Sequence, residues 1–450
     1  MLAIILALYT KNIVLSLSGG IFLGLFFLHG FSFLATADAL VALFFSLLSE
    51  GWILKTLAFA VLVGSVMELM QKSGGINGFV SFMTQKTRLV NSPRSALLVS
   101  YFIGVLIFIE SSITALIAGA VGRPLCDKEK VPHAKLAFVC DSTSAPVSSL
   151  IVLNGWGALL LGLIATQIQT GIIEGDNVNL LLHSVMYNFY AMSALVVTFL
   201  AVWFNIDIGA MKHAKPSLAK TALHVNAHVS MNYMLIPIFL MIAFVFVFLY
   251  ITGEGNMLKG SGSTSIYYTM LATLSVMFLY YVGTKNMSVK TYTKSAYIGA
   301  KKLFPIAVIL LFAFAIGEVT VDLKTGEYLA SLANESLSLF LLSGVIFLLS
   351  SIISFSTGTS WGTFSIMIPI AVPMAVGMDA DVALAIGAVI SGGVFGDHCS
   401  PISDTTIISS LASDCEVIEH VKTQLPYALI SGFIAFFLFI LFGFMTPGSS

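Results

Sequence analysis

Long runs of apolar residues constrain this chain more than any other feature of its sequence. Residues 13–31 (IVLSLSGGIFLGLFFLHGF) and 234–251 (MLIPIFLMIAFVFVFLYI) are each long enough to cross a hydrocarbon core of about 30 Å as a helix. Hydrophobic residues make up 58% of the 450, charged residues only 10%, and the mean hydropathy is +0.98. Because a soluble domain of this length cannot be so apolar, we expect an all-α polytopic membrane protein with about 10–12 membrane segments.

The distribution of lysine and arginine predicts how the segments cross the membrane, because cytoplasmic loops carry an excess of basic residues. The basic stretches are 86–94, 123–135, 212–228 and 285–302, and the acidic stretches that alternate with them are 174–177, 321–327 and 377–381. We therefore expect a protein of the bacterial inner (cytoplasmic) membrane in which residues 206–229 form a cytoplasmic linker between two halves.

Two apolar segments have flanks of the same character and are predicted to enter and leave on one side as helical hairpins. The first covers residues 95–122, between two basic stretches, and the second covers residues 333–375, between acidic or neutral stretches. The first hairpin would open to the cytoplasm and the second to the outside. Each is followed by a long apolar run that polar residues and proline interrupt, over residues 134–164 and 382–412.

The spacing of polar residues in these two runs indicates inverted repeats. Asp141, Ser144 and Ser148 in the first run have the same spacing as Asp397, Ser400 and Asp404 in the second, with Pro146 and Pro401 nearby. Since the runs cross in opposite senses, we expect inverted repeats over 1–205 and 230–450, each with a re-entrant hairpin and a discontinuous helix. The breaks would meet near the middle of the membrane.

Aspartates within a membrane are expected to serve a function, because a carboxylate in hydrocarbon costs a few kcal/mol, about 2.5–3.5 on insertion scales. Asp397, Ser400 and Asp404 share a helical face, and Pro401 cannot donate to the carbonyl of Asp397. Oxygen atoms of these kinds are the ligands that hard cations prefer, so a Na⁺ site is predicted. Buried acids at close range also take up protons, which would compete with the cation.

The candidate binding residues carry carboxylate or hydroxyl oxygens in the broken helices and at the hairpin tips. In the broken helices they are Asp141, Ser142, Thr143, Ser144, Asp397, Ser400, Ser403, Asp404 and Thr405, and at the tips Glu110, Ser111, Ser112, Thr357 and Thr359. The predicted Na⁺ ligands are Asp141, Asp397 and Asp404. The candidates for a proton relay are Asp397, Asp404, His398 and Glu110. Helix N-termini at the tips leave room for an organic anion.

Three stretches of sequence resemble a known family. Residues 396–410 (GDHCSPISDTTIISS), followed by 419–429 (EHVKTQLPYAL), resemble the C-terminal signature of the NhaC-type Na⁺/H⁺ antiporter family, and residues 123–147 resemble its N-terminal counterpart. The resemblance implies a secondary transporter of the ion transporter superfamily, with the acidic and hydroxyl positions as ion ligands. Some members of the family move organic acids or amino acids. Where the family pattern has two aspartates at the first hairpin tip, this chain has IESS with Glu110 alone. This departure leaves the ion stoichiometry and the substrate open and makes an organic substrate more plausible.

Three functions follow from these patterns. The leading one is antiport of Na⁺, or Li⁺, against protons by alternating access, and the second is Na⁺- or H⁺-coupled movement of a small organic acid or amino acid. The third is an intramembrane metalloenzyme built on Cys140, Asp397, His398 and Cys399. We expect a transporter embedded in membrane lipid rather than an enzyme, and we expect no cofactor. The net charge of −1 argues against a nucleic-acid partner, and the protein could form a homodimer. The four cysteines, which include Cys126 and Cys415, have no disulfide or zinc spacing and are expected to be free.

Overall fold

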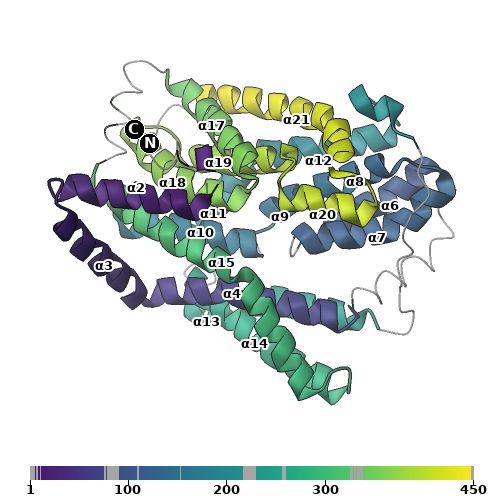
Figure 1. The fold of residues 1–450 in the computed structure, drawn as a ribbon, viewed down its shortest axis with the longest axis horizontal. Helices are drawn as coiled ribbons and strands as arrows, with labels where there is room; N and C mark the ends of the chain where they lie inside the picture. Colours follow the sequence, from purple (N-terminus) through teal and green to yellow (C-terminus); the bar gives the residue numbers. More distant parts are fainter. Residues whose placement is uncertain are drawn as a thin grey trace.

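The computed structural model consists of helices throughout the part of the chain that it describes (Figure 1). It describes residues 12–75, 91–108, 111–152, 154–215, 230–255, 260–324 and 338–446, together with residues 6, 9, 10, 78, 328 and 331. These ranges contain no strand, which confirms the all-α prediction.

The helices fall into two series. Those of the first half are α2 (Ile13–Leu28), α3 (Phe33–Ser49), α4 (Gly51–Lys72), α6 (Pro93–Leu106), α7 (Ser111–Glu129), α8 (His133–Ser142), α9 (Ala145–Leu150), α10 (Gly155–Gln169), α11 (Asn177–Met186), α12 (Phe189–Trp203) and the 3₁₀ turn η1 (Gly209–His213). Those of the second half are α13 (Asn232–Thr252), α14 (Gly262–Gly283), α15 (Val289–Asp322), the 3₁₀ turn η3 (Leu339–Leu341), α17 (Leu342–Thr357), α18 (Ser360–Gly377), α19 (Val382–Cys399), α20 (Asp404–Ser413) and α21 (Val417–Met445).

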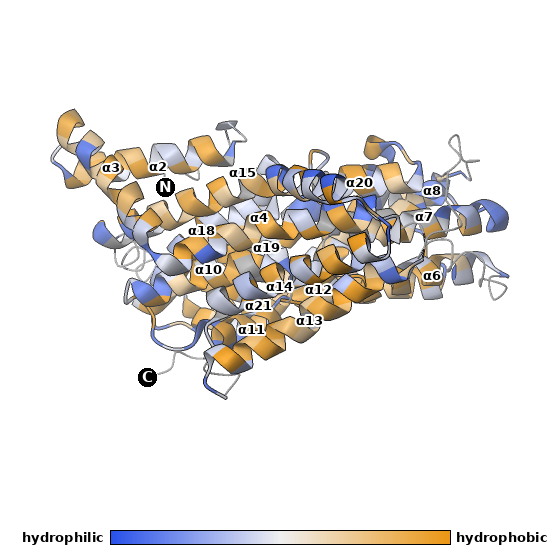
Figure 2. Ribbon diagram, turned by 90° about the horizontal axis from the view of Figure 1, so that it is seen from below, coloured by the Kyte–Doolittle hydropathy of each residue, from blue (hydrophilic) through white to orange (hydrophobic). Residues whose placement is uncertain are grey.

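Eight spans among the described residues are long and apolar enough to cross a membrane, or ten if each of two bent pairs counts as one span. The bent pairs are α8 and α9 with α10, at 46°, and α11 with α12, at 41°. In Figure 2 apolar residues predominate along most helices, and polar residues lie toward the ends of the bundle and on α20. The chain is therefore a multi-pass membrane protein, and the larger count agrees with the predicted number of segments.

The predicted hairpin ranges are occupied by two helix pairs, α6 with α7 and α17 with α18. In the second pair Gly358 joins the helices with a left-handed φ of +68°, and a Cβ atom there would overlap the backbone of Ile402. Both facts require glycine at this turn. Residues 109–110 and 333–337, which belong to the predicted hairpins, lie outside the described residues. The inverted relation of the two halves stays a prediction.

Both predicted broken runs are divided into separate helices. In the first, α8 ends at Ser142 and Pro146 lies in the first turn of α9, where its missing N–H is tolerated. In the second, α19 ends at Cys399 and α20 begins at Asp404, and Pro401 lies in the turn between them. The prediction that Pro401 leaves the carbonyl of Asp397 without a donor is wrong. The helix tightens before the proline, and the backbone N–H of Ser400 donates to that carbonyl at 3.0 Å.

The packing of the second broken helix brings the two halves together. Helix α19 packs against both α17 and α18, whereas α20 packs against α7 and α8 of the first half. Helix α21 contacts α8, α12 and α19. The ends of α8 and α19 therefore lie under one long helix, and any side chains directed from α21 toward the breaks can reach both.

Helices α4 and α15 approach closely at a pair of glycines, and in Figure 1 they cross each other. A Cβ atom on Gly64 would overlap the backbone carbonyl of Gly299, and a Cβ atom on Gly299 would overlap that of Gly64. Small residues at such crossings let two backbones pack closely, which is a main source of helix association in membranes.

We predict that Gly64→Ala lowers the thermal stability of the purified protein in detergent. The added methyl group must push α4 away from α15, and overpacking of this kind costs about 1–3 kcal/mol. The matched control is Gly283→Ala near the end of α14, where the added Cβ meets open space. The apparent Tm is measured by size-exclusion chromatography of samples heated to increasing temperatures. Equal Tm values for the two variants would contradict the prediction.

Candidate functional site

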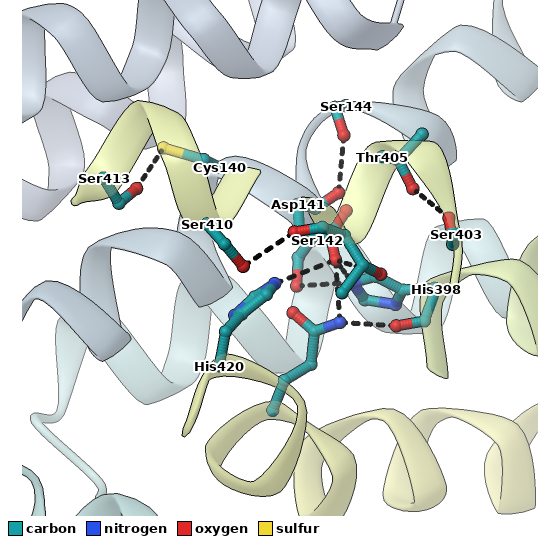
Figure 3. Close-up of polar contacts among 12 residues, drawn as sticks. Cys140, Asp141, Ser142, Ser144, His398, Ser403, Thr405, Ser410, Ser413 and His420 are labelled. Carbon is teal, nitrogen blue, oxygen red and sulfur yellow. Dashed lines mark hydrogen bonds and ion pairs between the residues drawn. The ribbon is translucent and has the colours of Figure 1, made fainter. Parts of the chain in front are cut away.

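A fully buried carboxylate, that of Asp141 near the end of α8, lies at the centre of the candidate site (Figure 3). Its Oδ2 atom accepts hydrogen bonds from the side-chain amide of Gln424 at 2.9 Å and from the hydroxyl of Thr406 at 3.3 Å. The ring Nε2 of His420 lies 3.1 Å from the same oxygen. Residues of α20 and α21 thus meet α8 on one carboxylate oxygen, and these donors offset part of the cost of burying the charge.

His398, at the end of α19, joins the second broken helix to the same cluster. Its Nε2 atom lies 3.2 Å from the hydroxyl of Ser142 and 3.9 Å from Oδ2 of Asp141. Its Nδ1 atom lies 2.6 Å from the hydroxyl of Tyr190 on α12. The amide of Gln424 also donates to the backbone carbonyl of His398. The structure therefore brings Asp141, Ser142 and His398 together, and all three are buried.

Two acceptor oxygens in this cluster have no donor. Among the described residues, Oδ1 of Asp141 and Oε1 of Gln424 are buried and make no hydrogen bond. Carboxylate and amide oxygens are ligands that hard cations accept. Within the described ranges, no group of three or more histidine, cysteine, aspartate or glutamate residues is arranged to hold a metal ion. The metalloenzyme hypothesis therefore gains no support from the structure. All four cysteines are free.

Asp397 lies in a different set of contacts. Its Oδ2 atom accepts a hydrogen bond from the hydroxyl of Ser360 at 2.6 Å and another from the backbone N–H of the same residue at 3.3 Å. The Ser360 hydroxyl also lies 3.2 Å from the carbonyl of Gly393. Because Ser360 is the first residue of α18, the carboxylate faces the positive end of that helix and fixes the hairpin tip to α19.

The remaining hydroxyls of the broken helices make mostly local contacts. Thr143 donates to the carbonyl of Val139 at 2.8 Å, and Ser144 donates to that of Asp141 at 2.9 Å. Ser400 donates across to the carbonyl of Phe355 on α17 at 2.8 Å, while Ser403 and Thr405 lie 3.0 Å apart. At the hairpin tip Thr357 donates to the carbonyl of Ile353 at 2.9 Å, and Thr359 is half-buried. Hydroxyls that bond back to their own helix are less available as ligands.

Several predicted residues lie outside what the structure describes. They are Glu110, whose position is not described, and Asp404 and Ser112, whose side chains are not described. Ser111 is buried at the start of α7. Asp141 and Asp397 have different described partners, so the prediction that Asp141, Asp397 and Asp404 share one Na⁺ ion stays a prediction.

Sequence reasoning missed His420, Gln424 and Tyr190 as members of the site. His420 and Gln424 are four residues apart and therefore share one face of α21. Both belong to the segment EHVKTQLPYAL, which carries the family resemblance, and a histidine and a glutamine inside an apolar helix were the available signal. Nothing in the local sequence of Tyr190 points to the site, because its partner, His398, comes from a distant segment.

Comparisons with known proteins identify the family to which the chain belongs. Residues 154–444 match the Na⁺/H⁺ antiporter family, a range that includes α19, α20 and all of α21 except its last residue. The chain belongs to the Na⁺/H⁺ antiporter family. An uncharacterized protein of Haemophilus influenzae is 32% identical over 472 aligned residues, which cover 100% of this chain and 90% of that protein.

Two further similarities concern function and fold. The malate-2H⁺/Na⁺-lactate antiporter of Bacillus subtilis is 37% identical over 113 residues, which are 25% of this chain and 24% of that antiporter. The crystal structure of the YdaH transporter of Alcanivorax borkumensis has a TM-score of 0.58 at 15% identity, and the match covers 91% of this chain and 89% of that one. At that identity the second comparison shows a shared fold alone.

Beside the site, charged residues join α7 and the first residue of α8 to the turn between α20 and α21. The guanidinium of Arg123 lies 3.3 Å from the carboxylate of Asp414. His133 lies 2.8 Å from Asp127 through Nε2 and 3.3 Å from the carbonyl of Asp414 through Nδ1. A Cβ atom on Gly119 would overlap Ala412, so α7 and α20 also pack closely. We call these contacts the Arg123–Asp414 latch.

A second ion pair lies close to the predicted linker. Lys135 on α8 is buried, and its ammonium group lies 2.7 Å from the carboxylate of Asp207 and 2.8 Å from the side-chain oxygen of Asn205. The hydroxyl of Tyr427 lies 3.0 Å from both the carbonyl of Ile206 and the N–H of Ile208. The first residues of the linker are therefore fixed to α8 and α21, while residues 216–229 lie outside the described residues.

We predict that breaking the Arg123–Asp414 latch exposes Cys140. This thiol is buried against α20, with its Sγ atom 3.8 Å from the hydroxyl of Ser413. In a background with Cys126, Cys399 and Cys415 replaced by serine, Arg123→Gln and Asp414→Asn should each raise the rate of Cys140 alkylation several-fold, because α20 loses its tie to α7.

The control and the background reactivity are available in the same chain. Lys128→Ala removes an exposed charge from α7 and should leave the alkylation rate unchanged. Burial, together with the carboxylates of Glu419, Glu416 and Asp414, raises the pKa of the Cys415 thiol to about 12, so its own reaction is slow even before replacement. Unchanged alkylation in both latch variants would contradict the prediction.

Proposed function

We propose that this chain is a secondary transporter of the bacterial inner membrane that exchanges Na⁺ for protons by alternating access. The observation that carries the proposal is the Asp141 carboxylate, which is fully buried and bound by donors from the second half of the chain. Family membership supports cation and proton substrates. In this proposal residues 206–229 are cytoplasmic, and Li⁺ is a second cation that the same oxygens can bind.

The chemistry of the proposal is competition for one buried negative charge. A carboxylate with its Oδ1 atom free of donors can accept either a proton or a cation, and each neutralises it. An unoccupied carboxylate is costly to move through a low-dielectric interior, whereas either occupied form is neutral. Exchange then follows if only the two neutral forms pass readily between the inward-facing and outward-facing states.

Asp397 and the hydroxyls of the second break complete the proposal. Asp397 holds Ser360 at the start of α18, so a cation that draws this carboxylate away would release the hairpin tip. In our proposal Asp397, Asp404 and Glu110 remain candidates for further cation or proton binding. The hydroxyls of Ser142 and Ser400, with the other serines and threonines named from the sequence, are candidate neutral ligands.

The second candidate function is Na⁺- or H⁺-coupled exchange of a small organic acid or amino acid. The observation that favours it is the local similarity to a malate-2H⁺/Na⁺-lactate antiporter. The positive end of α18 beside Ser360 is where a carboxylate substrate would compete with Asp397.

We predict that Na⁺ added to proteoliposomes with an imposed pH gradient changes the lumenal pH, and that Asp141→Asn reduces this change to that of protein-free liposomes. The variant keeps the volume of the side chain but removes the charge that both substrates neutralise. Asp379→Asn, in the exposed turn before α19, is the matched control and should behave as the wild type.

The outcomes separate the two functions. Activity in Asp141→Asn equal to that of the control would overturn the assignment of the exchange site. No response of the folded wild type to Na⁺ or Li⁺ alone, with a response restored by malate or lactate, would favour exchange of an organic acid.

A further inference from the structure

The side chain of Gln424 donates hydrogen bonds to both broken helices. One N–H bond of its amide points to Oδ2 of Asp141 at 2.9 Å, near the end of α8, and the other points to the carbonyl of His398, near the end of α19. The side chain is buried, so water does not compete for these bonds. Gln424 therefore holds two segments that are more than 250 residues apart in sequence, Asp141 and His398.

The orientation of the amide follows from its neighbours. Because a carboxylate oxygen and a carbonyl oxygen are both acceptors, the nitrogen of the amide has to face them. The oxygen, Oε1, then points elsewhere, and among the described residues it has no donor. Oδ1 of Asp141 is also buried and also has no donor among those residues. A buried acceptor without a donor costs about 1–3 kcal/mol, so a positively charged partner for these two oxygens would stabilise the site.

We propose that Gln424 determines the specificity of the cation site, with its N–H groups positioning the Asp141 carboxylate and its Oε1 atom acting as a ligand of the transported cation. This inference rests on the proposed function. An amide adds an oxygen ligand without adding charge, so the site holds one negative charge from Asp141 and matches a monovalent cation. A carboxylate in place of the amide would give two charges, which is the composition that sites for divalent cations use.

The test uses Gln424→Met, which keeps the length of the side chain and removes both the N–H donors and the oxygen. We expect the KM for Na⁺ in proteoliposomes to rise at least about tenfold, as the loss of a hydrogen bond to a charged group predicts, while the rate at saturating Na⁺ stays within about twofold. Equilibrium binding of ²²Na⁺ to the protein in detergent should weaken by the same factor.

The matched control is Thr423→Val on the same helix. Thr423 is equally buried, but the hydrogen bonds of its hydroxyl within the described ranges go to the carbonyls of Glu419 and His420 on its own helix. This variant should keep the KM of the wild type. A role in folding alone would reduce the amount of active protein in either variant and would leave the KM unchanged.

The failures of the two proposals differ. If the folded wild type binds no ²²Na⁺, the proposed function fails and Gln424 has no cation to select. If the wild type binds ²²Na⁺ and Gln424→Met has an unchanged KM and an unchanged binding constant, the inference about Gln424 is wrong. A second variant, Gln424→Glu, should raise binding of Ca²⁺ relative to Na⁺, and an unaltered ratio would also count against the inference.

Discussion

The burial of one carboxylate, that of Asp141, is the constraint on which the rest of the site depends. A negative charge inside a membrane protein needs donors, and here they come from α20 and α21, which are more than 260 residues away in sequence. To supply them, α20 must pack against α7 and α8, and α21 must lie over both breaks. The contacts that stabilise the buried carboxylate are therefore the same contacts that join the two halves of the chain.

The two aspartates of the breaks have different environments, which suggests a division of roles. Asp141 is held by side chains, and one of its oxygens has no donor in the part of the chain that the structure describes, whereas Asp397 is bound to the N-terminus of α18 at the hairpin tip. In our account the first neutralises its charge with a proton or a cation. The second couples that change in charge to the position of the hairpin tip, and the Arg123–Asp414 latch joins the C-terminal end of α20 to α7.

The sequence was sufficient for the membrane character, the helix pairs and the positions of both breaks, because long apolar runs and prolines act locally. It was also sufficient to single out Asp141, Asp397 and His398, since polar side chains are rare in such runs. It could not show that Gln424 and Thr406 reach Asp141, or that Tyr190 reaches His398, because these contacts join segments far apart in the chain. The carbonyl of Asp397 was misjudged because a local tightening of the helix supplied a donor.

The most direct test of the central claim measures the affinity of the purified protein for Na⁺ as a function of pH, with no membrane and no transport. Competition for the single charge of Asp141 predicts a linked change in affinity. Below the pH at which the Na⁺-free site is half protonated, the apparent Kd for Na⁺ should rise about tenfold for each unit of pH, while the amount bound at saturation stays constant. An affinity for Na⁺ that does not change with pH would contradict the account.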